Sequence, residues 1–269
     1  MSALPGRVVL LGHPVSHSLS PTFQNAALRR ASLPLTYEAM DIAPDELAFA
    51  ASLLRANNAA GNVTVPHKES FAALCDTLSP IAARVGAVNT FWVDDGALVG
   101  DNTDVGGFEQ AIAQSFGAER EWPTMALIGA GGAAAAVVAA AERWTGSRVA
   151  VWSRNRARAE RLAERFPHAQ CAESLEHALA DAALVVHATP LGLRAADALP
   201  VPVQSLPVRA CVFDLVYVRG ETAWVHAARA AGHQAADGLG MLIAQGALSF
   251  ERWFGQVPDR EAMWAAVRE

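Results

Sequence analysis

A short apolar run, a glycine-rich turn and an alanine-rich segment follow one another in the second half of the chain, and they constrain the fold most. Residues 125–128 have the length and composition of a buried parallel strand. They lead into Gly129-Ala130-Gly131-Gly132-Ala133-Ala134, and alanines continue to about Arg143. This order is typical of a dinucleotide-binding motif, because the glycines let the backbone approach a pyrophosphate and the helix N-terminus offers N–H donors. The spacing is GxGGAA rather than GxGxxG.

The next expected strand, residues 148–152, indicates which dinucleotide fits. NAD sites usually carry Asp or Glu at the end of this strand, to bind the ribose hydroxyls. Here Ser153 and Arg154 follow the strand, with Arg158 four residues further on. Guanidinium groups bind phosphate through charge-assisted hydrogen bonds, so the sequence favours NADP over NAD. Arg161 and Arg165, spaced with Glu160 and Glu164, are interpreted as ordinary surface ion pairs on a helix.

Apolar runs alternate with amphipathic segments through most of the chain, which predicts an α/β fold with parallel sheets and right-handed crossovers. Glu119–Pro123 is the expected domain boundary, and residues 87–100 contain a predicted hairpin around Asp94-Asp95-Gly96. Further strands are expected at 7–12, 36–42, 183–190 and 210–217, and helices at 44–55, 105–117, 222–232 and 241–254.

The composition excludes several functional classes. The 269 residues are 52% hydrophobic and 18% charged, which is typical of a globular protein rather than a disordered one. A net charge of −6 provides no basic field for nucleic acid or an anionic membrane, and the apolar runs are too short to span a bilayer. We read no signal peptide, so the expected location is the cytoplasm. Three separated cysteines without Cys-x-x-Cys, and no HExxH, argue against a disulfide framework and against a metal site.

A lysine follows a predicted strand end in Gly61-Asn62-Val63-Thr64-Val65-Pro66-His67-Lys68. Val63–Val65 is β-branched, and Pro66 ends the ladder because it has no N–H to donate. Lys68 then precedes an expected helix from Glu69 to Cys75. It is either an ordinary exposed lysine or a functional one, and a positive charge at a helix start is mildly unfavourable for structure. Asp104, in Asn102-Thr103-Asp104, can serve both as a helix N-cap and as a functional carboxylate.

Serines gather in the loop after the first expected strand. Ser20 precedes Pro21, and we interpret Ser20 as a helix N-cap. Capping does not account for Ser16 and Ser18, whose alternate spacing could aim both hydroxyl groups the same way. They either bind a carboxylate or polyol ligand or are solvated loop residues.

Taken together, these motifs resemble those of the shikimate dehydrogenase family, in the family's order and over nearly the whole chain. The resemblance is carried by Ser16–Pro21, Gly61–Lys68, Ala87–Thr90, Asn102–Asp104, Gly129–Ala134, and Asp237-Gly238-Leu239-Gly240-Met241-Leu242 through Gln245-Gly246.

The resemblance implies a mixed-sheet or parallel-sheet α/β substrate domain, formed by residues 1–104 and 239–269. It also implies a Rossmann-type NADP-binding domain at 105–238, with a cleft between the two. The implied reaction is the reversible reduction of 3-dehydroshikimate to shikimate. Lys68 and Asp104 would be catalytic. Substrate contacts are implied for Ser16, Ser18, Asn62, Thr64, Asn89, Tyr217 and Gln245. Cofactor contacts are implied for Gly129, Ala130, Gly131, Gly132, Ala133, Ser153, Arg154, Arg158, Gly238 and Met241.

Some alternatives stay open at the level of sequence. Hydride transfer to a ketone leaves charge on oxygen, which requires a proton and a nearby cation, and either Lys68 or Asp104 could carry that proton. A quinate or quinate/shikimate dehydrogenase using NAD or NADP is the alternative enzyme, and a non-catalytic dinucleotide sensor is the alternative from another class. The chain departs from the family pattern at Gln24, Ala135, Ser153, Asn155 and Arg219. We expect no nucleic-acid partner, no membrane and a monomer or homodimer.

Overall fold

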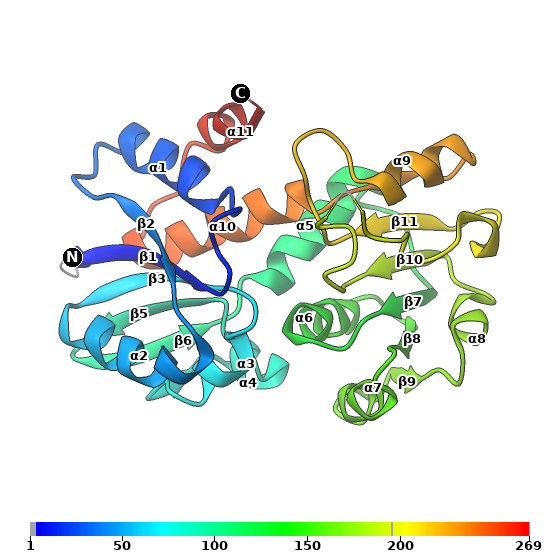
Figure 1. Ribbon diagram of the computed structural model, residues 1–269, viewed down its shortest axis with the longest axis horizontal. Helices are drawn as coiled ribbons and strands as arrows, with labels where there is room; N and C mark the ends of the chain where they lie inside the picture. The colour runs from blue at the N-terminus through cyan, green and yellow to red at the C-terminus, as the bar shows by residue number, and fades with distance from the viewer. Residues whose placement is uncertain (1–3, 195, 269) are drawn as a thin grey trace. The chain divides into compact units, whose positions relative to one another are not determined.

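The computed structural model describes residues 4–194 and 196–268, which form two compact units (Figure 1). Unit 1 consists of Met1–Gly107 with Leu242–Glu269, and unit 2 of Phe108–Met241. Helices α5 (Asp104–Phe116) and α10 (Leu239–Phe254) each contribute residues to both units.

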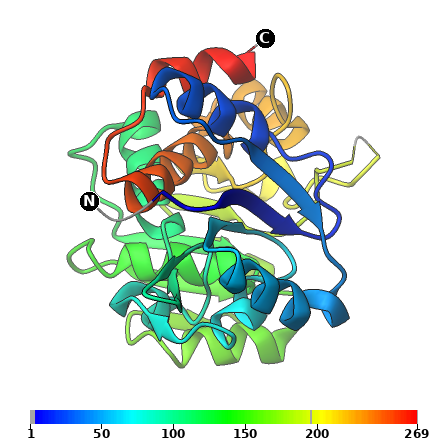
Figure 2. The same cartoon turned by 90° about the vertical axis from the view of Figure 1, so that its left-hand side faces the viewer.

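Within its described residues, unit 1 contains a six-stranded mixed sheet in the order β2-β1-β3-β5-β6-β4 (Figure 2). The strands are β1 (Arg7–Gly12), β2 (Tyr37–Asp41), β3 (Ala59–Val63), β4 (Thr77–Leu78), β5 (Thr90–Asp94) and β6 (Ala97–Asp101). Strand β1 pairs in parallel with β2 and β3, whereas β5 runs antiparallel to both β3 and β6. The carboxyl ends of β1, β3 and β6 therefore meet the amino end of β5 at one edge, which we call the carboxyl edge of unit 1.

Helices cover both faces of this sheet (Figure 2). One side carries α2 (Leu47–Ala56), α3 (Lys68–Ala72) and α4 (Pro80–Val85), and the 3₁₀ turn η1 (Pro44–Glu46) precedes α2. The other side carries α1 (Ser20–Arg30), α10 and α11 (Arg260–Arg268). Successive residues of a strand point to opposite faces, and both sets in β1 are buried. Val9 and Leu11 pack in the core with Leu47 and Ala51, while Val8 is fully buried on the other face.

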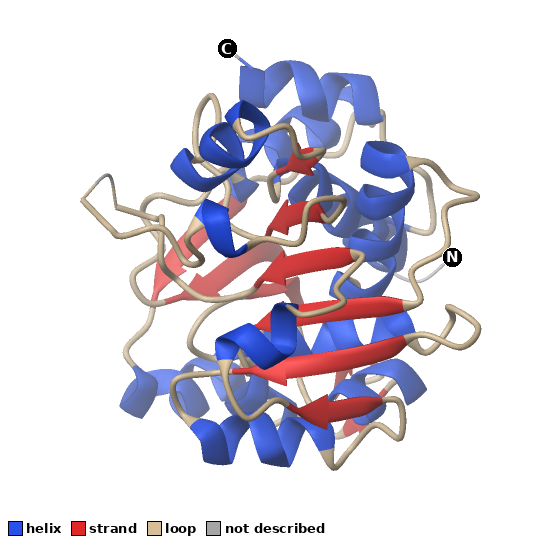
Figure 3. Cartoon of the chain, turned by 90° about the vertical axis from the view of Figure 1, so that its right-hand side faces the viewer, coloured by secondary structure: helices blue, strands red, loops and turns tan. Residues whose placement is uncertain are grey.

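Unit 2 contains, among its described residues, a six-stranded parallel sheet in the order β12-β11-β10-β7-β8-β9, and Figure 3 shows its arrows running in one direction. The strands are β7 (Thr124–Ile128), β8 (Arg148–Trp152), β9 (Ala169–Cys171), β10 (Leu184–His187), β11 (Cys211–Asp214) and β12 (Ala235–Ala236). The chain proceeds outward from β7 to β9 and then returns to place β10 beside β7. In open α/β sheets, ligands bind outside the carboxyl ends of the strands at such a switch point.

Helices α6 (Gly132–Ala141), α7 (Arg156–Ala163), α8 (Leu175–Leu179) and α9 (Ala223–Ala230), with the 3₁₀ turn η2 (Val203–Ser205), complete unit 2. Ala126 and Ile128 of β7 lie in a core cluster with side chains of α8 and α9, and Leu127 is fully buried on the opposite face. Both faces of the sheet are thus covered, which explains the continuous apolar runs of its strands. The predicted fold, a mixed-sheet α/β domain with a Rossmann-type domain, is confirmed.

The prediction that Ser20 caps α1 is wrong. Leu19 occupies the N-cap position, and Ser20 is the first helical residue. The backbone N–H of Ser20 instead donates to the Ser18 hydroxyl at 3.2 Å, so Ser18 satisfies a donor at the helix start. The sequence pattern therefore placed the hydroxyl that serves the helix start two residues too late.

Two local boundaries also differ from expectation. The strand expected to end at Val65 ends at Val63, two residues earlier in the chain, so Thr64 lies in the following loop. The helix expected from Glu69 to Cys75 ends at Ala72, and β4, a two-residue strand paired with β6 that the sequence did not predict, follows it. A strand this short has no periodicity that a sequence pattern could detect.

Candidate active site and cofactor-binding site

Lys68 and Asp104 meet at the carboxyl edge of unit 1. Lys68 is the first residue of α3, directly after the loop that leaves β3, and Asp104 is the first residue of α5, after β6. The Lys68 Nζ lies 2.6 Å from Asp104 Oδ2, and the two side chains are 14% and 5% exposed. Lys68 is also the only lysine among the 21 lysine and arginine residues of the chain. A partly desolvated ion pair is thus built around the one ε-amine available.

The backbone around Lys68 is fixed from two directions. The ring of His67 is 1% exposed, and its Nε2 donates to the carbonyl oxygen of Ile42 at 2.7 Å, just past the end of β2. The carbonyl oxygen of Lys68 accepts from the N–H of Val88 at 2.9 Å. His67 therefore anchors the loop that presents the lysine.

Asn89 connects the ion pair to the other polar side chains of the site. Its Nδ2 lies 2.9 Å from Asp104 Oδ1, 2.9 Å from Thr103 Oγ1 and 3.1 Å from Gln245 Oε1. Its Oδ1 accepts from the backbone N–H of Thr103 at 2.7 Å. Two amide hydrogens serve three acceptors here, so Asn89 holds the Asp104 carboxylate and the Gln245 amide at the same point.

Asn62 lies deeper than the sequence suggested. It is 5% exposed; its Nδ2 donates to the Asn89 carbonyl oxygen at 3.0 Å and to Ser249 Oγ at 2.9 Å, and its Oδ1 accepts from the Tyr37 hydroxyl at 2.9 Å. These contacts make Asn62 a support for Asn89. Tyr37 and Ser249 were missed by sequence reasoning, and neither lies in a motif that could have indicated it.

The loops after β1 and β3 bring the remaining predicted residues of unit 1 to the same edge. The backbone N–H of His13 donates to the Val65 carbonyl oxygen at 3.1 Å, which joins the two loops. Thr64 is half-buried, Ser18 is half-buried and Ser16 is exposed. Gly12 permits the close approach, because a Cβ at that position would lie 2.6 Å from the Thr64 methyl group.

The glycine turn of unit 2 has the geometry that a dinucleotide requires. Gly129 has a φ of 131°, and a Cβ there would lie 2.5 Å from the Ala188 carbonyl oxygen, so only glycine fits. Gly131 is the N-cap of α6, and a Cβ on it would meet no atom within 4 Å. Ala130, Gly132 and Ala133 complete the turn and start the helix. The open face over unsatisfied helix N–H groups suits a pyrophosphate.

Arginine side chains stand beside this turn, at the end of β8. Arg154 and Arg158 are exposed, and neither guanidinium has a hydrogen-bond or ion-pair partner within the described part of the chain. Arg156, by contrast, pairs with Glu160 at 2.8 Å. Asn155, rather than an acidic residue, caps α7 by accepting from the backbone N–H of Arg158 at 3.2 Å. Two uncommitted cations and the neighbouring Ser153 fit a ribose that carries a 2′-phosphate.

The remaining predicted residues of unit 2 follow β11 and β12. Tyr217 is half-buried in the segment after β11. Gly238 packs against that segment: its N–H donates to the Val216 carbonyl oxygen at 3.0 Å, and a Cβ on it would lie 2.2 Å from the Leu215 carbonyl oxygen. Met241 is 7% exposed in the first turn of α10.

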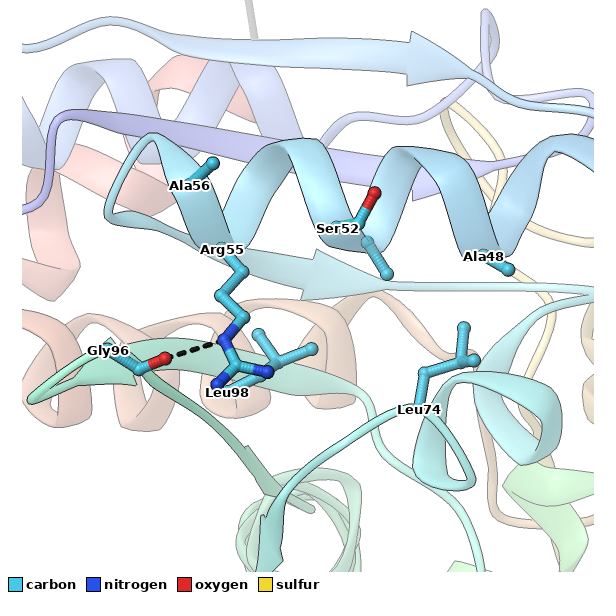
Figure 4. A pocket seen from close by; sticks show the side chains of 8 residues that line it. Ala48, Ser52, Arg55, Ala56, Leu74, Gly96 and Leu98 are labelled. Carbon is cyan, nitrogen blue, oxygen red and sulfur yellow. Dashed lines mark hydrogen bonds between the residues drawn. The ribbon is translucent and has the colours of Figure 1, made fainter.

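A pocket of about 440 Å³ in unit 1 lies between α2 and the β5–β6 hairpin, and none of the predicted site residues lines it (Figure 4). Its one cationic side chain, Arg55, donates to the Gly96 carbonyl oxygen at 2.6 Å and to Asp76 at 3.1 Å. Because that charge is already paired, the pocket lacks a group that would select a ligand.

Within residues 4–194 and 196–268, no three His, Cys, Asp or Glu side chains are grouped so that they could hold a metal ion. The same residues include no helix that combines the length and apolarity needed to cross a membrane.

The chain matches two family models: the shikimate dehydrogenase substrate-binding domain over residues 10–91, and the shikimate 5′-dehydrogenase C-terminal domain over residues 238–268. It is 42% identical to the shikimate dehydrogenase (NADP(+)) of Methylobacterium radiotolerans, across 96% of this chain and 94% of that protein.

Solved structures agree. Shikimate 5-dehydrogenase from Thermus thermophilus, in complex with NADP(H) and shikimate, superposes with a TM-score of 0.87 at 40% identity, covering 97% of this chain and 98% of that one. Quinate dehydrogenase from Corynebacterium glutamicum, in complex with NAD, has a TM-score of 0.85 at 29% identity, covering 96% and 97%.

The fold and the two sites thus define a two-unit dinucleotide-binding α/β protein with a lysine–aspartate pair. The chain belongs to the shikimate dehydrogenase family, as the resemblance of its motifs predicted.

Proposed function

We propose that the protein catalyses the reversible, NADP-dependent reduction of 3-dehydroshikimate to shikimate. The Lys68–Asp104 pair, 2.6 Å apart at the carboxyl edge of unit 1 in a chain of this family, is the observation that carries the proposal. The glycine turn and the two free arginines of unit 2 support NADP as the cofactor, which supplies or takes up the hydride when bound.

Lys68 is the proton carrier in this proposal. Both carboxylate oxygens of Asp104 accept hydrogen bonds, one from Lys68 and one from Asn89, so the carboxylate orients its partners and has no proton to give. The ammonium group has three donors, and one of them is committed to Asp104. In the reduction, Lys68 donates a proton to the ketone oxygen as negative charge develops there; in the oxidation, its amine takes that proton back.

The surrounding residues bind and orient the substrate. Gln245 presents an amide group beside the ion pair that suits a hydroxyl group of a polyol, and Asn89, whose amide contacts Asp104, Thr103 and Gln245, holds these groups in place. Thr64 adds a hydroxyl at the same edge, and Ser16 and Ser18 suit the substrate carboxylate from the loop after β1. Asn62 is assigned as a positioning residue for Asn89 because both its amide hydrogens are engaged inside the unit.

Initial-rate kinetics with shikimate and with quinate, each with NADP⁺ and NAD⁺, test the proposal and its alternatives. Turnover confined to shikimate with NADP⁺ is expected, since the relative at 42% identity is named an NADP-dependent shikimate dehydrogenase and the quinate dehydrogenase is 29% identical. Comparable rates with quinate or NAD⁺ would favour the alternative enzyme. Tight NADPH binding without turnover of either acid would favour a dinucleotide sensor.

Replacing Lys68 tests the catalytic assignment. Lys68→Ala should lower kcat by about 10²- to 10⁴-fold, the usual contribution of a general acid–base group. Lys68→Arg should be similarly slow, because a guanidinium keeps the charge but does not release a proton at neutral pH. The Kd for NADPH, measured by fluorescence, should stay within about twofold, since the lysine lies in unit 1 and the cofactor residues in unit 2. Near-normal turnover by either variant would remove Lys68 from the mechanism.

A further inference from the structure

A buried chain of hydrogen bonds in unit 2 plays no part in the reaction as described so far. The ring of His187, the last residue of β10, is 0% exposed, and its Nδ1 lies 2.8 Å from Oδ1 of Asp214, the last residue of β11. The other carboxylate oxygen of Asp214 accepts from the Thr222 hydroxyl at 2.9 Å. On the far side of the ring, His187 Nε2 is hydrogen-bonded to the hydroxyl of Thr189. Buried polar groups connected in this way fix one another's orientation.

The direction of each hydrogen bond follows from the donors present. Asp214 Oδ1 also accepts from the backbone N–H of Val216 at 3.0 Å, so the carboxylate is an acceptor throughout and the His187 ring donates through Nδ1. With the imidazole in its neutral form, Nε2 carries a lone pair, and the Thr189 hydroxyl donates to it. The Thr189 oxygen accepts from the backbone N–H of Leu191 at 3.2 Å, which leaves one lone pair without a partner among the described residues.

Thr189 lies at the switch point of the sheet. Strands β7 and β10 are neighbours, with Ile128 opposite His187 in register. The glycine turn leaves β7 next to the turn that leaves β10, and a Cβ on Gly129 would lie 3.3 Å from the Thr189 methyl group. Thr189 is half-buried, whereas His187 behind it is closed to solvent. The free lone pair of Thr189 is therefore held at the edge where the dinucleotide is expected.

We propose that Asp214 and His187 act as positioning residues that make the Thr189 hydroxyl a dedicated hydrogen-bond acceptor for the nicotinamide nucleoside half of the cofactor. This inference rests on the proposed use of NADP. The acceptor suits an N–H of the carboxamide or an O–H of the ribose, and it offers no proton to a phosphate oxygen. The arginines at the end of β8 mark the adenosine half on one side of the glycine turn, so β10, on the other side of β7, faces the nicotinamide half.

NADPH, and adenosine 2′,5′-bisphosphate, which lacks the nicotinamide half, distinguish this role of Thr189 from a general effect of its substitution on unit 2. Thr189→Val keeps the shape of the side chain and removes its hydroxyl. We expect it to weaken NADPH binding about threefold to tenfold, the value of one neutral hydrogen bond, and to leave the Kd of adenosine 2′,5′-bisphosphate unchanged. Thr189→Ser should bind both ligands normally. Equal weakening for both ligands, or no weakening for NADPH, would overturn the proposal.

Thr124→Val is the matched control. Thr124 begins β7, at the opposite edge of the same sheet, where its hydroxyl donates to the Asp181 carbonyl oxygen. Losing that hydroxyl should leave the affinity for both ligands unchanged, whether or not the substitution lowers the stability of the protein.

Replacements of His187 that differ in the hydrogen bonds they can donate and accept test its role. His187→Leu should reproduce the loss of NADPH affinity seen in Thr189→Val, and the double variant should be no weaker than either single one, because both remove the same interaction. His187→Gln should recover much of the affinity, since an amide can donate to Asp214 and accept from Thr189. Additive losses, or no recovery with glutamine, would reduce His187 to a core residue.

A failure of the proposed function would appear differently. If the unaltered protein bound adenosine 2′,5′-bisphosphate but not NADPH, the cofactor assignment itself would fall before any variant was compared. The binding measurements need no turnover, so the choice between shikimate and quinate does not affect them.

Discussion

Asn62 shows how a side chain that was expected to contact substrate is engaged inside the unit instead. Its partners are distant in the chain: Tyr37 and Ser249 are 25 and 187 residues away from Asn62, and they use up its hydrogen-bonding groups. A one-dimensional pattern places polar residues at an edge, but it does not say which of them are already paired.

Burial also decides the chemistry of Cys75. Desolvation raises the pKa of its thiol to about 12, and the negative charge of Asp76 acts in the same direction. Because the thiolate is the reactive form, iodoacetamide should modify Cys75 at pH 8 on the order of 100-fold more slowly in the native protein than after unfolding.

Peptide mapping by mass spectrometry would follow this reaction, with Cys171 as the internal comparison. Cys171 is half-buried; burial raises the pKa of its thiol, and the positive charge of Arg156 acts in the opposite direction. Modification of Cys75 as fast as Cys171 in the native protein would show that the thiol is not held in its protonated form.

At the scale of helices and strands, the long amphipathic and apolar segments were predictable and the short ones were not. The strand Arg148–Trp152 has the predicted bounds, and the predicted hairpin is formed by β5 and β6. Apolar runs of five or more residues carry enough periodicity to be recognised. Strand β4 has only two residues, and the start of α1 depends on which neighbouring serine hydroxyl meets one backbone N–H, so neither could be found that way.

The contact between α5 and α10 within unit 1 depends on one glycine. A Cβ on Gly107 would lie 2.7 Å from the Gln245 Cβ and 3.0 Å from its backbone nitrogen, so the helices would have to separate. Gly107→Ala should cost about 1–3 kcal/mol of unfolding free energy, as overpacking typically does, and should lower kcat by moving Gln245. Urea denaturation and steady-state rates measure the two effects.

Gly106 provides the control for this substitution, because it precedes Gly107 in the same helix. An added Cβ there would approach the end of the Leu248 side chain at 2.9 Å, and that end can rotate away. Gly106→Ala should therefore cost less than Gly107→Ala. Equal losses would indicate that the helices tolerate a larger separation than the glycine contact implies.

The molecule as a whole repels the cofactor that it is proposed to bind. Its net charge is −6, and NADP is a polyanion, so binding depends on local cations and helix N–H groups rather than on the overall field.

The fold class and the place of the glycine turn could be predicted because strand and helix patterns alternate over long distances. The pair between Arg156 and Glu160 follows an i,i+4 spacing that the sequence contains, but whether Arg154 and Arg158 remain unpaired depends on their neighbours in space.

Thermal-shift titrations with NADP⁺ and NAD⁺ test whether the unpaired arginines bind the 2′-phosphate of the cofactor. A ligand at 100 times its Kd stabilises the folded protein by about 2.7 kcal/mol. Arg154→Ala and Arg158→Ala should each weaken NADP⁺ binding about tenfold or more, since each removes a charge-assisted contact to the 2′-phosphate, and should leave NAD⁺ binding unchanged. Arg156→Ala, which breaks only the pair with Glu160, should alter neither. Equal losses for both dinucleotides would place the arginines elsewhere on the cofactor.

The scarcity of lysine has a practical consequence. Among the side chains of this chain, only Lys68 offers a primary amine, and that amine is in the ion pair with Asp104. Reagents that couple proteins to beads, dyes or sensor surfaces through lysine would find their one side-chain target inside the proposed active site. Coupling through Lys68 therefore inactivates the attached molecules. A bound substrate that covers the amine would protect Lys68 from labelling.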